Sequence, residues 1–341
     1  MTVSRPLRIG LVSCHPDRFS SYYPTAAEPA FVPTEPSITP DDQILVDELR
    51  RRGHQVTSVV WGCSVEALRN QFDLLVVRST WDYMDSEESR RQFVTWLSDL
   101  EQAGVVVENH PQVMLWLTDK SYLLDFAAVG VPIVPTRIVG AGESLSLVQH
   151  FDRHGPLIVK PAISAAGAGL MLLQSRDEAS TFQREFVTRC QTSSQLVQPF
   201  LPEIRDRGEW SLVYLDGRYS HAVHKLPAAG GILVHAEQGG SLRFAAPPAA
   251  ARTLTDLVVD RCHAAISRTH PEAKLLQDAF PPLYLRIDVI ETAAGTVVSE
   301  CEGVEPELFF RARLGSEQLC CEAIERKFGN AVVYQETRST R

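Results

Sequence analysis

The order of strands and helices in the amino-terminal part constrains the fold of this chain more than any other feature. Apolar runs predict buried strands at residues 7–13, 55–61 and 74–77. A helix is expected at residues 41–52, which begin with acidic side chains and end in arginines before a glycine, and another at residues 87–103. Because strands and helices alternate here, we predict an open α/β sheet.

A polar and aromatic segment, RSTWDY, directly follows the strand predicted at residues 74–77. Open α/β sheets bind ligands beyond the carboxyl ends of their strands, so we interpret this segment as a substrate-binding loop. The alternative is that Trp81 and Tyr83 only pack against the protein and close the loop. The candidate substrate-binding residues are Arg78, Ser79, Thr80, Trp81, Asp82 and Tyr83.

The rest of the chain predicts a few helices and a series of antiparallel strands. Helices are expected at residues 116–129, before a glycine and a proline, and at residues 318–328. The expected strands are residues 157–160, 170–173, 195–200, 210–214, 219–225, 283–290 and 296–301, with a tight turn at Asp216 and Gly217. Six prolines between residues 16 and 40 predict a long irregular loop, and the polar tail predicts a frayed end.

The length and the charge of the chain exclude several classes of protein. A chain of 341 residues usually exceeds one hydrophobic core, so two or three domains are expected. With 33 Lys and Arg against 42 Asp and Glu, a net charge of -9 and no basic tract, nucleic acid is not an expected partner. The absence of a long apolar run and of a signal-peptide pattern predicts a soluble, cytoplasmic protein with no membrane partner.

The cysteines and histidines argue against disulfides and a structural zinc site. The 7 cysteines are scattered, odd in number and free of any CxxC pair. No HExxH motif occurs among the histidines. We therefore expect His221 and His224 to be partly exposed residues of a strand rather than metal ligands.

Two lysines and a loop of small residues form a candidate phosphate-binding region. Lys160 ends an apolar strand directly before a proline, and Lys120 lies at another junction of predicted elements. Such a lysine can meet phosphate oxygens as a point charge. The loop at residues 164–169 contains serine, alanines and glycines, so its backbone amides can approach a phosphate and cover it as a lid. Neither a Walker A motif nor a GxGxxG motif is present.

Three carboxylates on two predicted strands form a candidate metal site. Glu300 and Glu302 are two residues apart, so both side chains point to one face, and Asp288 can join them from the neighbouring strand. These carboxylates would repel one another unless they hold cations, and their oxygens suit Mg²⁺ or Mn²⁺ bridging nucleotide phosphates. The alternative is a solvated face of an antiparallel sheet. Arg286 shares this face and is placed to hold a phosphoryl group or a substrate carboxylate, whereas Cys301 points to the opposite, core face.

Together these motifs resemble the ATP-grasp superfamily, in its glutathione-synthetase-like branch, and there small proteins similar to the cyclo-ligase of cycloserine biosynthesis. The resemblance covers residues 41–310 and rests on Lys120, IVKP around Lys160, QPFLPEI at 198–204, GEWSLVYLDG at 208–217, and the RID and ECEGVEP segments. It implies an α/β plus α+β chain with the ATP-grasp fold. The implied parts are an amino-terminal open α/β domain at residues 1–117, a small lobe at 118–198, a large lobe with the metal site at 199–334, and a frayed tail at 335–341.

The resemblance also implies roles for individual residues. The ATP-binding set would be Lys120, Lys160, Ser164, Gly167, Gly169, Gln198, Pro199, Phe200, Leu201, Glu203, Glu209 and Lys225. In that set the backbone of residues 198–201 would read the adenine edge, and Glu203 would hold the ribose. The metal ligands would be Asp288, Glu300 and Glu302, the last standing where many relatives have asparagine. The catalytic residues would be Arg286, Lys160 and Lys225, and Gly239 and Gly240 would join the substrate-binding residues.

One segment departs from the pattern of the family. Similar relatives usually carry an arginine near a glycine pair, whereas residues 230–241 read GGILVHAEQGGS, with Leu233 in the place of the arginine. If that arginine normally holds the acceptor or the acyl phosphate, either the substrate differs here or Arg286 and Arg243 replace it.

The implied activity is ATP-dependent ligation of a carboxylate to an amine, within one molecule or between two, through an acyl phosphate with release of ADP and phosphate. The substrates would be an amino acid or a small peptide, in specialised metabolism such as antibiotic biosynthesis. The cofactors would be ATP and Mg²⁺ or Mn²⁺, and a homodimer is a compatible assembly. Two alternatives stay open: an ATP-grasp kinase or ligase that modifies a peptide or protein tail, and a non-catalytic nucleotide-binding regulatory protein. The complete acidic set argues against the last.

Overall fold

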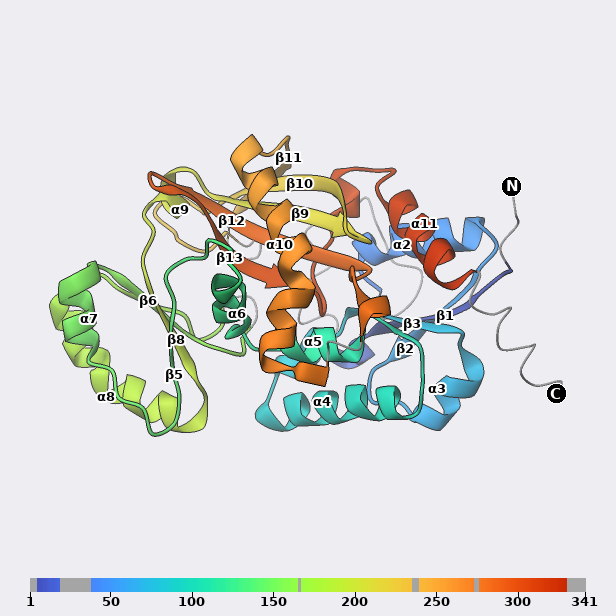
Figure 1. Cartoon of the computed structure of the whole chain (residues 1–341), viewed down its shortest axis with the longest axis horizontal. Coiled ribbons are helices and arrows are strands. Elements are labelled where there is room, and N and C mark those ends of the chain that lie inside the picture. Colours follow the sequence, from blue (N-terminus) through green and yellow to red (C-terminus); the bar gives the residue numbers. More distant parts are fainter. Residues whose placement is uncertain (1–4, 19–37, 165–166, 235–238, 273–275, 330–341) are drawn as a thin grey trace.

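The described residues form three β-sheets that follow one another along the chain (Figure 1). The structure is a computed structural model, and it describes residues 5–18, 38–164, 167–234, 239–272 and 276–329. Most of the predicted irregular loop and the predicted frayed tail at residues 335–341 lie outside these ranges.

The first sheet is parallel and confirms the predicted open α/β arrangement. Its strands follow the order β2-β1-β3-β4. The elements are β1 (Arg8–Ser13), α2 (Pro40–Arg51), β2 (Gln55–Val60), α3 (Val65–Gln71), β3 (Leu74–Ser79), α4 (Glu87–Gln102) and β4 (Val107–Glu108). Helix α3 and the short strand β4 were not expected from the sequence.

Helices cover both faces of this first sheet. On β3, Leu75 and Val77 pack in one cluster with Phe93 of α4, whereas Leu74 and Val76 pack with α2 in another. Strands that are buried on both faces are apolar at successive positions, which is why the LLVV run predicted β3 correctly. Helix α11 (Glu317–Phe328) contacts α2, so the last described helix packs against the first part of the chain (Figure 1).

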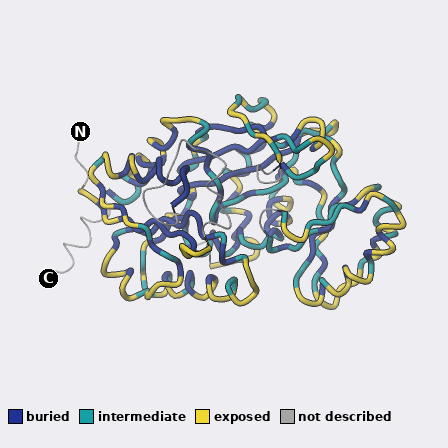
Figure 2. The backbone as a smooth tube through the Cα atoms, turned by 180° about the vertical axis from the view of Figure 1, so that it is seen from behind, coloured by how far each residue is buried: buried dark blue, intermediate teal, exposed yellow. Residues whose placement is uncertain are grey.

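The second sheet is antiparallel, with the strand order β5-β8-β6-β7. Its elements are β5 (Arg137–Val139), α7 (Leu147–His154), β6 (Leu157–Pro161), β7 (Met171–Leu173), α8 (Arg176–Thr192) and β8 (Gln195–Pro199). Strands β6 and β7 form the predicted hairpin, but α7 and α8 were not predicted. Both helices bury apolar side chains against the sheet and expose their outer faces (Figure 2).

The prediction of one continuous helix at residues 116–129 is wrong. The chain forms α5 (Pro111–Thr118) and α6 (Tyr122–Ala128) with a break between them. At the break, the Asp119 carboxylate accepts hydrogen bonds from the Ser121 backbone nitrogen at 2.9 Å and from its hydroxyl at 2.7 Å. Such local side-chain bonds compete with the helical hydrogen bonds. The break places Lys120 in a turn.

The third sheet is antiparallel, with the strand order β11-β10-β9-β12-β13. Its elements are α9 (Glu203–Asp206), β9 (Glu209–Leu215), β10 (Arg218–Leu226), β11 (Ser241–Phe244), α10 (Ala249–Thr269), β12 (Tyr284–Thr292) and β13 (Gly295–Glu302). The turn at Asp216 and Gly217 is as predicted, with φ angles of 47° and 71° that a type I′ hairpin requires. Helix α10 contacts β9, β12 and β13. In the described part of the chain, no helix is long and apolar enough to span a membrane.

The expectation of partly exposed histidines on β10 is wrong. His221 is 0% and His224 9% exposed, because other segments of the chain pack against both side chains. Their ring nitrogens contact backbone carbonyls, His221 that of Leu308 at 2.8 Å and His224 that of Arg207 at 2.6 Å. The cysteines are free, as expected, and Cys301 is a core residue.

Asp41, in the first turn of α2, makes the stability of the protein depend on pH. It is 2% exposed and accepts a hydrogen bond from the Arg311 backbone nitrogen at 3.0 Å. Burial and the nearby Glu307 carboxylate raise the pKa of Asp41 to about 7, although the Arg311 charge opposes this shift. An unfolded chain loses the same proton near pH ~4. The unfolded state therefore binds fewer protons between these pH values, and stability falls as pH rises through this window.

The variant Asp41→Asn is expected to lack this loss of stability. Between about pH 4.5 and 8, its free energy of unfolding should rise relative to that of the wild type by about 2–4 kcal/mol, since one pKa unit corresponds to about 1.4 kcal/mol. Urea unfolding at both pH values measures the change. Asp177→Asn is the control, because Asp177 lies in the first turn of α8 but is exposed. Parallel pH profiles of Asp41→Asn and wild type would refute the expectation.

Candidate active site

Strand pairing in the third sheet brings the predicted carboxylates together. Asp288 of β12 lies opposite Glu300 of β13 and opposite Ser211 of β9, and Arg286 lies opposite Glu302. Residues that pair directly across antiparallel strands project their side chains to the same face. The convergence expected from the sequence spacing is therefore present.

Lysine and arginine side chains neutralise much of this face. The Lys225 ammonium lies 2.9 Å from a Glu209 oxygen and 3.3 Å from an Asp288 oxygen. The Arg286 guanidinium lies 3.1 Å from Asp288 and also pairs with Glu302. Although burial disfavours its charged form, the pKa of Lys225 is raised by Asp288 and Glu209. Lys225 and Arg286 are therefore charged, and ion pairs hold them in one network with Glu209 and Asp288.

Two lysines approach the same face from the second sheet and from the break before α6. The Lys120 ammonium lies 3.0 Å from Glu300 and also donates to the Ser164 carbonyl. The Lys160 side chain, near the end of β6, makes no hydrogen bond or ion pair with any described residue, and burial lowers the pKa of its ammonium. A lysine without a partner is available to bind a phosphate oxygen.

The carboxylates influence one another's protonation. Burial raises the pKa of Glu302 to about 8; Arg286 opposes this shift, while the charges of Glu300 and Asp288 add to it. Burial also works against ionisation of Glu300, but the nearby lysines outweigh it and lower its pKa. At neutral pH Glu302 therefore keeps a proton for most of the time, and a cation bound at this face would favour its ionised form.

The donor set of Asp288, Glu300 and Glu302 fits a divalent cation by chemistry, because hard carboxylate oxygens are the ligands that such ions prefer. Among the described residues, no group of three His, Cys, Asp or Glu side chains stands together as a formed metal site. Each of the three carboxylates is instead paired with a lysine or arginine. Metal binding by these carboxylates stays a prediction. It requires that the ion replace the lysine and arginine side chains that pair with them here.

The predicted phosphate lid connects β6 and β7, and its residues 165–166 lie outside the described ranges. Gly167 and Gly169 both have a φ of 73°, which favours glycine. The Ser164 hydroxyl donates to the Pro161 carbonyl at 3.1 Å. A Cβ atom on Gly167 would lie 3.0 Å from a Leu233 methyl group. Leu233 therefore lies against the predicted lid.

The residues predicted to contact adenine and ribose lie on β8 and directly after it. They are Gln198, Pro199, Phe200, Leu201 and Glu203. The Gln198 side chain donates to a threonine hydroxyl at 2.8 Å, and the Phe200 backbone nitrogen donates to the Pro156 carbonyl at 2.8 Å. Glu203 accepts from the Ala293 backbone nitrogen at 3.4 Å. The segment thus joins the second sheet to the third, and its contacts with a nucleotide stay predictions.

Three of the predicted substrate-binding residues have buried partners within the protein. Arg78 is 2% exposed and lies 2.9 Å from the Asp42 carboxylate of α2, which also accepts from the Ser79 hydroxyl. Asp82 accepts from the Trp61 indole nitrogen at 2.6 Å. These contacts fix the loop in place, and direct substrate contact by these three residues stays a prediction.

The aromatic residues of the same loop contact the segment after β13. Thr80 is buried and precedes the short helix η1 (Trp81–Met84). The Trp81 indole donates to the Glu305 carbonyl at 3.3 Å, and the Tyr83 hydroxyl donates to the Glu305 carboxylate at 3.1 Å. The Tyr83 ring also stacks on Phe93, with centroids 4.4 Å apart. The loop therefore packs, as the alternative expected, and also contacts the segment after β13.

Gly239 and Gly240 lie directly before β11, and residues 235–238 of the same segment lie outside the described ranges. Gly239 has a φ of 82°. Arg243, on the exposed edge strand β11, lies 3.5 Å from a His224 ring nitrogen. The substrate contacts of the two glycines stay predictions.

Sequence reasoning missed two polar residues of this site, Ser211 and Glu305. The Ser211 hydroxyl donates to Asp288 at 2.6 Å. A signal was available for Ser211, since it lies two positions after Glu209 on a predicted strand and so shares its face. Glu305 follows the end of β13, where the strand periodicity no longer indicates the direction of a side chain.

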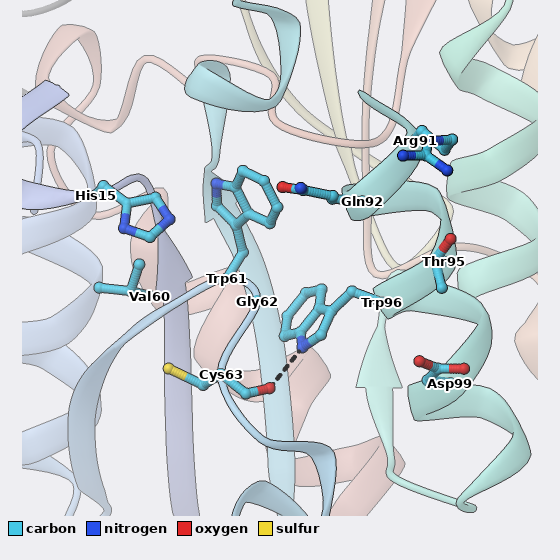
Figure 3. A pocket seen from close by; sticks show the side chains of 10 residues that line it. All are labelled: His15, Val60, Trp61, Gly62, Cys63, Arg91, Gln92, Thr95, Trp96 and Asp99. Carbon is cyan, nitrogen blue, oxygen red and sulfur yellow. Dashed lines mark hydrogen bonds between the residues drawn. The ribbon is translucent and has the colours of Figure 1, made fainter. Parts of the chain in front are cut away.

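A pocket of about 700 Å³ opens beside α4, apart from these residues (Figure 3). It is lined by His15, Val60, Trp61, Gly62, Cys63, Arg91, Gln92, Thr95, Trp96 and Asp99. The Trp96 indole donates to the Cys63 carbonyl at 3.0 Å. None of the predicted site residues lines this pocket.

Two family models match the chain. Residues 23–109 match the N-terminal domain of D-cycloserine synthetase DcsG, and residues 119–258 match the ATP-grasp domain of prokaryotic glutathione synthetase. The second match contains Lys120, Lys160 and Lys225 and ends before β12 and β13.

Individual proteins are similar to the chain over different lengths. The cycloserine biosynthesis protein DcsG of Streptomyces lavendulae is 28% identical over 246 residues, which cover 70% of this chain and 78% of that protein. A glutathione synthetase of Synechocystis is 29% identical over 163 residues, which cover 48% of this chain and 47% of that protein. The chain thus matches about half the length of that glutathione synthetase.

Solved structures agree with the observed architecture. The crystal structure of D-cycloserine synthetase DcsG has a TM-score of 0.72 at 22% identity, covering 94% of this chain and 99% of that one. D-alanine-D-alanine ligase from Bacillus anthracis, complexed with ATP, has a TM-score of 0.61 at 14% identity, covering 98% and 100%. These likenesses show a shared fold.

The three sheets, the family match and the solved structures identify the chain as a member of the ATP-grasp superfamily. Within that superfamily its ATP-grasp domain is of the prokaryotic glutathione synthetase type, and over most of its length it is similar to D-cycloserine synthetase. The resemblance noted in the sequence is therefore confirmed.

Proposed function

We propose that the protein is an ATP-dependent carboxylate-amine ligase that releases ADP and phosphate. The observation that carries this proposal is the arrangement of Lys120, Lys160 and Lys225 around Asp288 and Glu300 on an ATP-grasp fold. The names of its relatives, glutathione synthetase and D-alanine-D-alanine ligase, support amide formation. The similarity to a cycloserine biosynthesis protein supports a role in specialised metabolism, with an amino acid or a small peptide as substrate.

The reaction has two steps. In the first, an oxygen of the substrate carboxylate attacks the γ-phosphorus of ATP, and the bond between that phosphorus and the oxygen of ADP breaks. In the second, the amine nitrogen attacks the acyl carbon, the carbon-oxygen bond to phosphate breaks, and the amine loses a proton. Lys160, which has no partner among the described residues, would bind a phosphate oxygen in the first step, with Lys120 and Lys225 supplying further positive charge.

ATP-grasp enzymes use ATP and a divalent metal ion. We propose that Asp288, Glu300 and Glu302 hold this ion, and that it is Mg²⁺ or Mn²⁺. When bound, the ion neutralises charge on the phosphate oxygens. Arg286, beside the same carboxylates, would stabilise the acyl phosphate.

The proposed division of the chain assigns residues 1–117 to a substrate-side domain, 118–198 to a small lobe and 199–334 to a large lobe. Each range contains one of the three sheets of the described structure, except that β8 of the second sheet ends at Pro199, and this supports the division to within one residue. Helix α11 belongs to the third range but contacts α2 of the first. A cytoplasmic location and a homodimeric assembly stay predictions.

A screen for ADP release tests the proposed function. The full chain is supplied with ATP, Mg²⁺ and amino acids, singly and in pairs, and the products are analysed by mass spectrometry. We expect ADP together with a product lighter by one water than its substrates, formed from one amino acid if a ring closes and from two if they are joined. A phosphorylated product would support a kinase instead, and nucleotide binding without ADP release across the whole panel would support a regulatory protein.

A further inference from the structure

Glu305 joins the predicted substrate loop to the carboxylate-bearing part of the third sheet. It lies shortly after β13, which ends at Glu302, and its carboxylate accepts a hydrogen bond from the Tyr83 hydroxyl at 3.1 Å. The Trp81 indole donates to the Glu305 carbonyl at 3.3 Å, and Arg78 donates to the carbonyl of Pro306 at 2.8 Å. These bonds join two segments that lie more than two hundred residues apart in the sequence. The loop at residues 78–83 therefore fixes the position of Glu305.

Glu305 differs from the neighbouring carboxylates in having no cationic partner. Four carboxylates of the site lie within ion-pair distance of a lysine or arginine: Glu209, Asp288, Glu300 and Glu302. In the described part of the chain, Glu305 receives a side-chain hydrogen bond from the neutral phenol of Tyr83 and no ion pair. An ionised carboxylate has about four acceptor positions, so most of its capacity is unused.

Burial makes the ionised form of Glu305 unfavourable as long as no cation pairs with it. Burial raises the pKa of its carboxyl to about 7, although the Tyr83 hydroxyl and the more distant charges of Lys120 and Arg286 oppose the shift. A partly desolvated carboxylate gains most from a group that brings both positive charge and N–H donors. An ammonium group provides three donors and one positive charge.

We propose that Glu305 binds the ammonium group of an amino-acid substrate, and that Tyr83 orients the Glu305 carboxylate for this contact. The proposal rests on the proposed ligase function and specifies its substrate class as a small acid that carries a free amine. The proposal also assigns a role to the loop at residues 78–83, which positions Glu305 for substrate binding. Arg78 and Trp81 anchor the loop to the segment after β13, and Tyr83 acts on the substrate through Glu305.

Calorimetric titration of the full chain tests this subsite directly. The protein is saturated with Mg²⁺ and a non-hydrolysable ATP analogue and titrated with the D and L forms of the common amino acids and with the corresponding acids that lack the amine. At least one amino acid should bind about tenfold or more tightly than its amine-free counterpart. Glu305→Gln should lower the affinity for that amino acid about 10- to 100-fold and leave the affinity for the amine-free acid unchanged.

Two further variants separate ligand binding from a structural role. Glutamine keeps an oxygen that can accept the Tyr83 hydrogen bond, so a purely structural Glu305 would leave amino-acid affinity unchanged in Glu305→Gln. Tyr83→Phe removes only the orienting hydroxyl and should lower the affinity by a few fold. Glu143→Gln is the matched surface control, because Glu143 is exposed and pairs with Arg137.

Each outcome of the titration decides the proposal. Equal amino-acid affinity of Glu305→Gln and wild type overturns it, as does equal affinity of the wild type for amino acids and amine-free acids. Failure of the whole panel to bind also overturns it. A higher Mg²⁺ requirement in Glu305→Gln with unchanged amino-acid affinity would assign Glu305 to the metal instead. Amino acids that bind through Glu305 without supporting ADP release would contradict the proposed ligase function and leave this subsite standing.

Discussion

The variant Lys160→Met is expected to release ADP at least about 100-fold more slowly than the wild type, because it lacks a cation at the phosphates. Lys160 lies next to the last residue of β6, its side chain makes no hydrogen bond or ion pair with any described residue, and burial lowers the pKa of its ammonium. The charges of Glu300 and Glu209 oppose this shift only in part, so an anion that contacts the Lys160 ammonium directly would stabilise it further. A coupled assay of ADP formation with saturating substrates measures the effect.

The same substitution should not destabilise the protein. Methionine has a similar length and no charge to desolvate, so the free energy of unfolding should stay constant or rise by about 1 kcal/mol. Lys327→Met is the matched control, since the Lys327 ammonium lies 3.0 Å from the buried Glu108 carboxylate. It should cost about 2 kcal/mol or more in urea unfolding and leave ADP release unchanged. Near-normal activity of Lys160→Met, or destabilisation like that of Lys327→Met, would show that Lys160 has a structural role.

The variant Glu300→Gln is expected to lower the rate of ADP release about 100- to 1000-fold. Its carboxylate lies opposite Asp288 and 3.0 Å from the Lys120 ammonium. Burial disfavours its charge, but Lys120 and Lys160 outweigh burial and lower the pKa of Glu300, so it is ionised at neutral pH. Glutamine keeps the shape and removes the charge that the predicted metal site and Lys120 require.

The Mg²⁺ dependence of the rate distinguishes loss of a metal ligand from general damage. In Glu300→Gln, the Mg²⁺ concentration that gives half the maximal rate should rise, while the circular dichroism spectrum stays that of the wild type. Glu143→Gln, at an exposed position, should change neither quantity. Wild-type activity and Mg²⁺ dependence in Glu300→Gln would be incompatible with the metal assignment.

The carboxylate-bearing strands were predictable because a strand repeats every two residues. Glu300 and Glu302 share a face by that period alone, and the apolar positions between the charged ones fix which face enters the core. The turn at Asp216 and Gly217 was predictable for a local reason too, since both residues tolerate positive φ. Local periodicity and turn chemistry therefore determined the parts of the fold that carry the predicted metal site.

Other elements depend on contacts that short sequence windows do not contain. The break between α5 and α6 depends on two hydrogen bonds accepted by Asp119, which compete with the helix only in that geometry. Strand β11 is an exposed edge strand and lacks the alternation of buried and exposed residues that would have revealed it. The burial of His221 and His224 depends on segments outside β10, whose Leu308 and Arg207 carbonyls contact the two histidine rings.

The hydrogen-bond partners of the predicted substrate loop could not be predicted either, because they lie far away in the sequence. The strand-end rule predicted a substrate-binding loop at residues 78–83, and the structure places this loop against the segment after β13. Two side chains of this loop have distant partners. Arg78 pairs with Asp42 of α2, and Tyr83 donates a hydrogen bond to Glu305, which follows a strand of the third sheet. Only the folded chain distinguishes Arg78, which anchors the loop, from Tyr83, which reaches the proposed ammonium site.

Transfer of oxygen-18 tests the central claim, activation of a carboxylate by ATP, most directly. The amino acid that supports ADP release is labelled with oxygen-18 in its carboxylate, and the released phosphate is analysed by mass spectrometry. If an acyl phosphate forms, the carboxylate oxygen that attacked the γ-phosphorus leaves with the phosphate, so each phosphate released should carry one labelled oxygen. Unlabelled phosphate, released together with ADP and product, would contradict the account.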